Sequence, residues 1–81
     1  QALVVSVERD GATWLDGVKV SHAALPGALK RHRLVHRALL VRADGDVALQ
    51  QAVRVLDAGR GAGFAELSIA TRRRSAGQAG P

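Results

Sequence analysis

The feature that most constrains the fold is a strand–helix–strand pattern over residues 37–71. Residues 37–43 (RALLVRA) have a continuous apolar centre, which is typical of a central strand. An amphipathic helix follows, with apolar residues at i, i+3, i+4 and i+7: Leu49, Ala52, Val53 and Leu56. Residues 66–71 (ELSIAT) form the predicted closing strand, with Leu67 and Ile69 inward. Strands joined in this way are parallel, and the crossover between them is right-handed.

The ends of this helix carry separate signals. Asp44 or Asp46 is expected to cap its N-terminus, because a carboxylate there accepts hydrogen bonds from free amides. Gly63 is the expected terminator, since glycine readily adopts the left-handed conformation that ends many helices. Gly59, Gly61 and Gly63 should weaken the last turn, each by up to about 1 kcal/mol relative to alanine where it is helical. Four polar residues are expected to point outward: Gln50, Gln51, Arg54 and Asp57.

The first part of the chain predicts a hairpin and a third short strand. Residues 2–9 (ALVVSVER) alternate between apolar and polar, which indicates a half-buried strand. Asp10-Gly11 is a tight-turn signal, and residues 12–15 then form the return strand. Asp16-Gly17 is a second turn, followed by a short extended piece over residues 18–20.

A first helix is expected over residues 22–33, with Ser21 as its N-cap. Pro26 removes a hydrogen bond and crowds the preceding turn, so the regular helix should start late or have a distorted first turn. The element order is therefore β-β-β-α-β-α-β. It predicts an α+β fold: a small two-layer domain with a mixed sheet of four to five strands and two helices packed on one face.

Length and charge divide the chain into a domain and a tail. The 81 residues suffice for one domain, predicted over residues 1–71, with a disordered basic tail over residues 72–81. The net charge is +5; three of the twelve basic residues lie in the tail, and without them nine basic against seven acidic residues leave +2.

A second basic concentration lies within the domain. Residues 17–43 contain no Asp or Glu, and the basic residues there are Lys19, Lys30, Arg31, Arg33, Arg37 and Arg42. They are expected to form a positive face that attracts acidic proteins, anionic polymers or lipid headgroups. The alternative is a solvated face that only keeps the protein soluble.

Catalysis is not expected, because the residues that could support it lack their usual context. No serine lies in a nucleophile elbow, and no glycine-rich phosphate loop follows a strand. The chain has no cysteine. His32 and His36 share a helical face, but they lack a third ligand other than His22, and neighbouring arginines would repel a metal ion. The sequence therefore predicts no metal, no cofactor and no small-molecule substrate.

The sequence contains no apolar stretch of the roughly 20 residues that a membrane span requires, and no signal peptide. The chain begins at Gln1 without an initiator methionine, so it is expected to be a processed product or a fragment.

An ordered series of short motifs resembles the ExbD/TolR biopolymer-transport family over residues 2–71. In the second half the matching positions are Arg42-Ala43-Asp44, Val47, Val55-Leu56-Asp57 and Ala62-Gly63. In the first half they are Asp10-Gly11, Leu15-Asp16-Gly17, Val20-Ser21 and Leu25-Pro26. The chain departs from the family pattern at Ala48-Leu49 and at Gly59 and Gly61, which bears on the length of the second helix.

The resemblance implies a protein with a short cytoplasmic start, one transmembrane helix and a periplasmic domain. The proton-handling aspartate of the family lies on the membrane helix, beside an ExbB/TolQ-like subunit, so no residue of this chain corresponds to it. The complete protein would couple proton flow across the inner membrane to movement of a TonB/TolA-like partner, and so power outer-membrane transport or integrity. The domain itself would dimerise and contact that partner or peptidoglycan.

Two sets of residues are candidates for partner contact. The first is the closing strand, which could add a second copy or an extended partner segment at a sheet edge: Glu66, Leu67, Ser68, Ile69, Ala70 and Thr71. The alternative is that this strand lies in the middle of the sheet, fully paired. The second set is Arg42 and Asp44, read as a partner site or as a local arrangement in which Asp44 caps the helix and Arg42 pairs with Asp44 or Asp46.

The rival functional interpretation is a small basic domain that binds nucleic acid. The segment 17–43 and Arg72-Arg73-Arg74 would supply phosphate contacts. A sheet that reads RNA needs aromatic side chains on its open face, and Trp14 is the only candidate. The nucleic-acid interpretation is therefore the less favoured.

Overall fold

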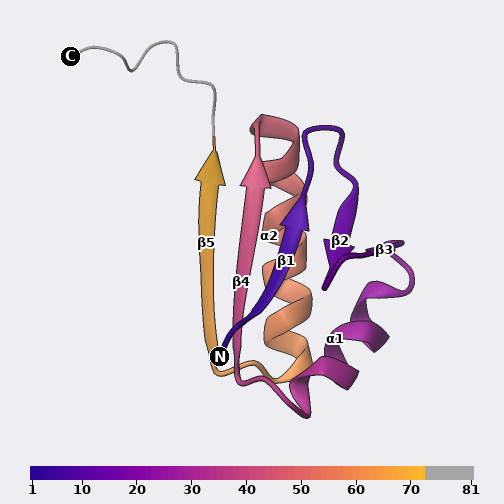
Figure 1. Ribbon diagram of the computed structural model, residues 1–81, viewed down its shortest axis with the longest axis vertical. Coiled ribbons are helices and arrows are strands. Elements are labelled where there is room, and N and C mark those ends of the chain that lie inside the picture. Colours follow the sequence, from indigo (N-terminus) through magenta and orange to yellow (C-terminus); the bar gives the residue numbers. More distant parts are fainter. Residues whose placement is uncertain (73–81) are drawn as a thin grey trace, which may run out of the picture.

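Seven elements follow one another in the predicted order. In the computed structural model, which describes residues 1–72, they are β1 (Leu3–Val7), β2 (Thr13–Leu15), β3 (Val18–Val20), α1 (Leu25–Arg33), β4 (Ala38–Asp44), α2 (Asp46–Ala62) and β5 (Glu66–Arg72). The strands form one five-stranded sheet in the order β3-β2-β1-β4-β5. β1, β4 and β5 are parallel, whereas β2 and β3 complete an antiparallel meander. Both helices cover the same face (Figure 1), which confirms the predicted two-layer α+β fold with a mixed sheet.

Apolar residues at alternate positions of the strands form the sheet side of the core. The register pairs Leu3 with Leu39 and Val5 with Val41, so the apolar residues of both strands point to the same face. These side chains are almost completely buried beneath the helices. The other members of the core are Val7, Leu15, Leu25, Ala28, Leu29, Ala43, Ala48, Ala52, Val55 and Phe64. The opposite face of the sheet has no layer packed on it among the described residues.

The face that α2 turns to the sheet differs from the predicted one. Gln51 and Val55 are buried, whereas Val53, expected to face the core, is 51% exposed. The reason is close packing against the sheet: a Cβ added to Gly59 would collide with the side chain of Leu39. Of the apolar residues that the spacing favoured, Ala52 is buried and Leu56 is partly buried against the core, whereas Val53 is turned outward.

The start of α2 also corrects the prediction that Asp44 or Asp46 caps it. Gly45 is the N-cap residue, and no side chain makes a capping hydrogen bond. Gly45 has a φ of 99°, a left-handed conformation that suits glycine and turns the chain from β4 into the helix within one residue. Asp46 is already in the first helical turn.

The other helix ends confirm the predicted late start of α1 and the predicted end of α2, but not the predicted N-cap of α1. α1 begins at Leu25 with Pro26 in its first turn, so the expected late start is confirmed. Ser21 is not its N-cap, because its Oγ accepts from Ala24 N–H at 3.2 Å and closes the turn that precedes the helix. Gly63 ends α2 with a φ of 100°, as predicted. β5 extends to Arg72; the rest of the expected tail, residues 73–81, lies outside the described residues.

Candidate partner-binding face and edge of the sheet

β5 forms one edge of the sheet, with β4 as its only neighbouring strand among the described residues. The alternative position in the middle of the sheet is therefore wrong. Five of its side chains are exposed: Glu66, Ser68, Ile69, Ala70 and Thr71. Leu67 is partly buried, and Ile69 is 38% exposed although its register with Val41 turns it to the helix side. An edge strand of this kind offers backbone N–H and C=O groups to an added strand.

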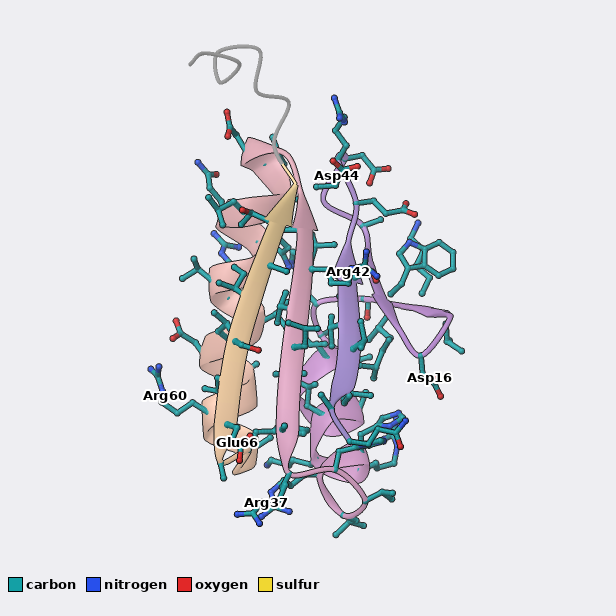
Figure 2. All side chains as sticks on the ribbon, turned by 60° about the vertical axis from the view of Figure 1, so that its left-hand side comes forward. Asp16, Arg37, Arg42, Asp44, Arg60 and Glu66 are labelled. Atoms are coloured by element: carbon teal, nitrogen blue, oxygen red, sulfur yellow. The ribbon has the colours of Figure 1, made fainter. Side chains whose placement is uncertain are left out.

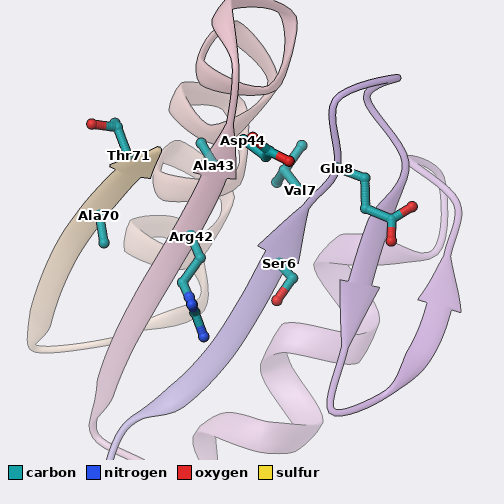
Figure 3. Close-up of a pocket in the computed structure, with 8 residues that line it drawn as sticks. All are labelled: Ser6, Val7, Glu8, Arg42, Ala43, Asp44, Ala70 and Thr71. Carbon is teal, nitrogen blue, oxygen red and sulfur yellow. The ribbon is translucent and has the colours of Figure 1, made fainter. Parts of the chain in front are cut away.

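A row of side chains crosses the open face next to this edge. The strand register places them in the order Ala70, Arg42, Ser6, Trp14 and Lys19, one from each strand. Figure 3 shows Arg42 and Ser6 side by side on the neighbouring strands β4 and β1. The indole Nε1 of Trp14 is buried and has no hydrogen-bond partner among the described residues. The row thus combines a small edge residue, an exposed cation and a single aromatic ring.

A hollow of about 400 Å³ lies where the carboxyl ends of β1, β4 and β5 meet. Its lining is drawn in Figure 3: Ser6, Val7, Glu8, Arg42, Ala43, Asp44, Ala70 and Thr71. Because Ala70 and Thr71 belong to the edge strand, the hollow opens beside the same edge. A segment that pairs with β5 would therefore have room for a side chain over Ala70.

Arg42 and Asp44 are not paired with each other. Asp44 Oδ1 lies 3.5 Å from an Nη of Arg9, a distance that makes an ion pair but not a hydrogen bond. Arg9 follows β1, and β1 pairs with β4. Arg9 therefore lies near Asp44 in space although the two residues are far apart in the sequence. The local arrangement predicted for Arg42 and Asp44 is wrong, and Arg42 stands exposed with no ion pair among the described residues.

The basic residues divide between two places. Lys30, Arg31 and Arg33 belong to the last turn of α1, and Arg37 precedes β4 at the same end of the molecule. Figure 2 shows Arg37 at the end opposite to Asp44. Lys19 is on β3, in register with Trp14, and does not join them.

Arg33 has a structural contact that the sequence did not indicate. Its Nε–H donates to the carbonyl oxygen of Gly63 at 2.7 Å, which joins the end of α1 to the end of α2. A cation at a helix C-terminus is also favoured by the helix dipole.

The three histidines do not assemble. The rings of His32 and His36 stack with centroids 6.2 Å apart, and Nδ1 of His36 lies 3.0 Å from the carbonyl oxygen of Gln1. His22 instead hydrogen-bonds to the buried Gln51 at 2.6 Å. Residues 1–72 contain no cluster of three or more His, Asp or Glu side chains that could hold a metal ion.

Sequence reasoning named Trp14 as a candidate for the open face but missed Arg9 and Ser6 as parts of the site. The alternation over residues 2–9 already placed Ser6 on the polar side of its strand, so it was a usable signal. The partner of Arg9 could not be found in this way, because it depends on which strand pairs with β1.

Within residues 1–72, no helix combines the length and apolar character needed to cross a bilayer.

Comparison with known proteins tests the resemblance carried by the sequence motifs. No curated protein sequence matches the chain. The family described as biopolymer transport protein ExbD/TolR matches residues 1–74, nearly the whole chain. On this match, the chain belongs to the ExbD/TolR family of energy-transducing biopolymer transport proteins.

Proposed function

We propose that this chain is the periplasmic, partner-binding domain of a membrane-anchored protein driven by the proton motive force. In this proposal the outer edge of β5 receives an extended segment of a TonB/TolA-like partner, or β5 of a second copy. The observation that carries it is the position of β5 at the end of the sheet, with exposed side chains at Ser68 and Ala70. Membership of a transport-associated family supports the same role.

Strand addition suits a domain without reactive groups. Backbone hydrogen bonds along β5 would supply affinity, and pockets for alternate side chains would supply selectivity. The hollow beside Ala70 is bordered by Arg42, an exposed cation without an ion pair among the described residues. The favoured partner segment therefore carries a carboxylate at the position that faces Arg42.

A partner and a second copy would compete for the same edge. A strand has only one free side once β4 occupies the other. The opposite edge of the sheet is β3, which has three residues and offers a much shorter pairing surface. Dimerisation and partner binding are accordingly alternative states of the domain, and a switch between them provides a way to pass on a mechanical signal.

The rest of the assembly follows from the family. A membrane helix preceding this domain would lie beside an ExbB/TolQ-like subunit and carry the proton-handling aspartate. The domain would stand in the periplasm, where peptidoglycan is a further proposed contact. In this proposal the chain binds and releases other chains and contributes no catalysis.

The proposal is tested by amide chemical-shift mapping. An ¹⁵N-labelled chain is titrated with a synthetic extended peptide from the periplasmic segment of a TonB-like protein. Shifts are expected over residues 66–71 and at Arg42. Shifts confined to β2 and β3, or none at all, would contradict the proposal.

A pair of lysine variants sharpens the test. Ala70→Lys fills the hollow that a side chain of the partner segment would occupy, so the peptide affinity should fall at least about tenfold. Val18→Lys places the same charge on β3, where the side chain is already exposed, and should leave the affinity unchanged. A single-stranded RNA that binds the chain with a steep salt dependence would favour the nucleic-acid interpretation instead.

A further inference from the structure

We infer that the loop between α1 and β4 docks on an anionic lipid surface, with Leu34 and Val35 entering the headgroup region. This goes beyond the proposed function, which concerns the edge of the sheet. Leu34 is 86% exposed and Val35 is 79% exposed, the two most exposed large apolar side chains of the described chain. Adjacent aliphatic side chains held this far out of the core suit insertion into an apolar medium.

Backbone hydrogen bonds hold Leu34 and Val35, the tip of this loop, in a fixed conformation. Leu34 N–H donates to the carbonyl of Arg31 at 3.3 Å, and Val35 N–H donates to that of His32 at 3.0 Å. The N–H of His36 donates to the same His32 carbonyl at 2.9 Å. Shallow insertion would therefore strip water from side chains without leaving these backbone donors unpaired, which is the main cost of placing a loop in lipid.

Cations outnumber acids at this end of the molecule, where the N–H of the acidic residue Glu66 donates to the carbonyl oxygen of Arg37 at 3.3 Å. Lys30, Arg31 and Arg37 are exposed and form no ion pair among residues 1–72, and Arg33 is held beside them by its bond to Gly63. The segment of residues 17–43 that contains them has no acidic residue. Each Lys or Arg near an anionic bilayer strengthens partitioning by about fivefold. The charge therefore selects headgroups of net negative charge.

The combination favours lipid over the other anionic surfaces. A nucleic acid or a cell-wall polymer would bind the cations but would gain little from two exposed aliphatic side chains. A stable protein interface buries roughly 800 Å² on each partner, far more than a two-residue tip offers. A bilayer needs only a few inserted side chains supported by cations.

The position of the N-terminus agrees with this orientation. The carbonyl of Gln1 is bonded to His36, two residues from Leu34, and Figure 1 shows the N-terminus close to the α1–β4 loop. With the membrane helix of the proposed function attached at residue 1, the tip would face the bilayer. β5 runs away from this end and would point its carboxyl end outward.

The first test uses a fluorescent reporter at the tip. The chain has no cysteine, so Val35→Cys gives a unique site for an environment-sensitive fluorophore. With vesicles of phosphatidylglycerol and phosphatidylcholine, its emission should shift to the blue and be quenched by brominated acyl chains. A label at Val53→Cys, on the exposed face of α2, should keep its aqueous spectrum. Sedimentation of the chain with vesicles while the label at residue 35 stays in water would overturn the inference.

The second test separates apolar insertion from charge. The double variant Leu34→Ser/Val35→Ser keeps every cation, and its partition coefficient on the same vesicles should fall about tenfold or more. The matched double variant Val47→Ser/Val53→Ser removes two exposed aliphatic side chains from α2. It should change the partition coefficient less than about twofold. Circular dichroism checks that both variants fold.

Two outcomes would oppose the inference. Equal vesicle binding by Leu34→Ser/Val35→Ser and the unchanged chain would mean that charge alone holds the protein. Displacement from vesicles by soluble peptidoglycan fragments, undiminished in that variant, would identify a wall-binding site. Neither readout involves peptide binding at β5, so this inference and the proposed function can fail separately.

Discussion

At the scale of single residues, two glycines of α2 have opposite surroundings. Gly59 is buried, and a Cβ there would collide with Leu39 and lie 3.3 Å from Cδ2 of Leu67. Gly61 is exposed, with no atom near the position of a Cβ. Leu39 is itself almost completely buried, so its side chain cannot move without disturbing the core. Gly59 is therefore what permits the close approach of α2 to the sheet.

Gly59→Ala and Gly61→Ala should shift stability in opposite directions. Alanine gains up to about 1 kcal/mol of helix propensity at either position. At position 59 overpacking costs about 1–3 kcal/mol, so a net loss of about 1 kcal/mol is expected. Gly61→Ala should raise the free energy of unfolding by about 0.5 kcal/mol, since it lies in the last turn. Urea denaturation measures both, and a stabilised Gly59→Ala variant would show that α2 is not seated so closely.

At the scale of elements, the two helices are joined at their C-terminal ends. Arg33, in the last turn of α1, donates to Gly63, the residue that ends α2. The contact satisfies a carbonyl that lies beyond the regular hydrogen bonding of the helix. It also fixes the turn from which the exposed tip of Leu34 and Val35 projects. One side chain thus couples the helix layer to the proposed lipid-binding loop.

Arg33→Gln should lower the free energy of unfolding by about 1 kcal/mol, because one partly exposed hydrogen bond is lost. Arg31→Gln removes the same charge from the same helical turn without a hydrogen bond to α2 and serves as the control. Thermal unfolding of the two variants compares them. Equal melting temperatures would mean that the contact with Gly63 adds nothing to stability.

At the scale of the whole molecule, the proposed pairing of two copies through the edge of β5 would have a defined geometry. Two chains that pair through β5 about a twofold axis form one continuous sheet, and each copy uses the same surface. The helices of both copies then lie on one side of that sheet, and the rows containing Arg42 lie on the other. The ends at which Lys30 and Arg37 gather are left outside the contact.

The mass of the chain in sedimentation equilibrium should therefore rise with concentration toward that of a dimer. Ala70→Lys should hold it at the monomer mass, because two added charges would meet across the new strand pair. The peptide that binds β5 should have the same effect by occupying the edge. A dimer that survives in Ala70→Lys but dissociates in Val18→Lys would place the contact at β3 instead.

The sequence by itself determined the elements and most of their ends. The order β-β-β-α-β-α-β, the tight turns at Gly11 and Gly17, the late start of α1 and the end of α2 at Gly63 all depend on neighbours within a few residues. Such features are set by backbone conformation and by short-range periodicity, which a single chain displays directly. The basic segment near α1 was visible for the same reason.

Only the tertiary structure decided which faces and edges those elements present. Periodicity favoured Val53 in the core and Gln51 outside, but close contact between Gly59 and Leu39 reversed them. The ion pair of Asp44 with Arg9 and the position of β5 at the edge required the order of the strands. Strand order and helix rotation are set by packing between segments far apart in the chain, and that packing leaves no local signature in the sequence.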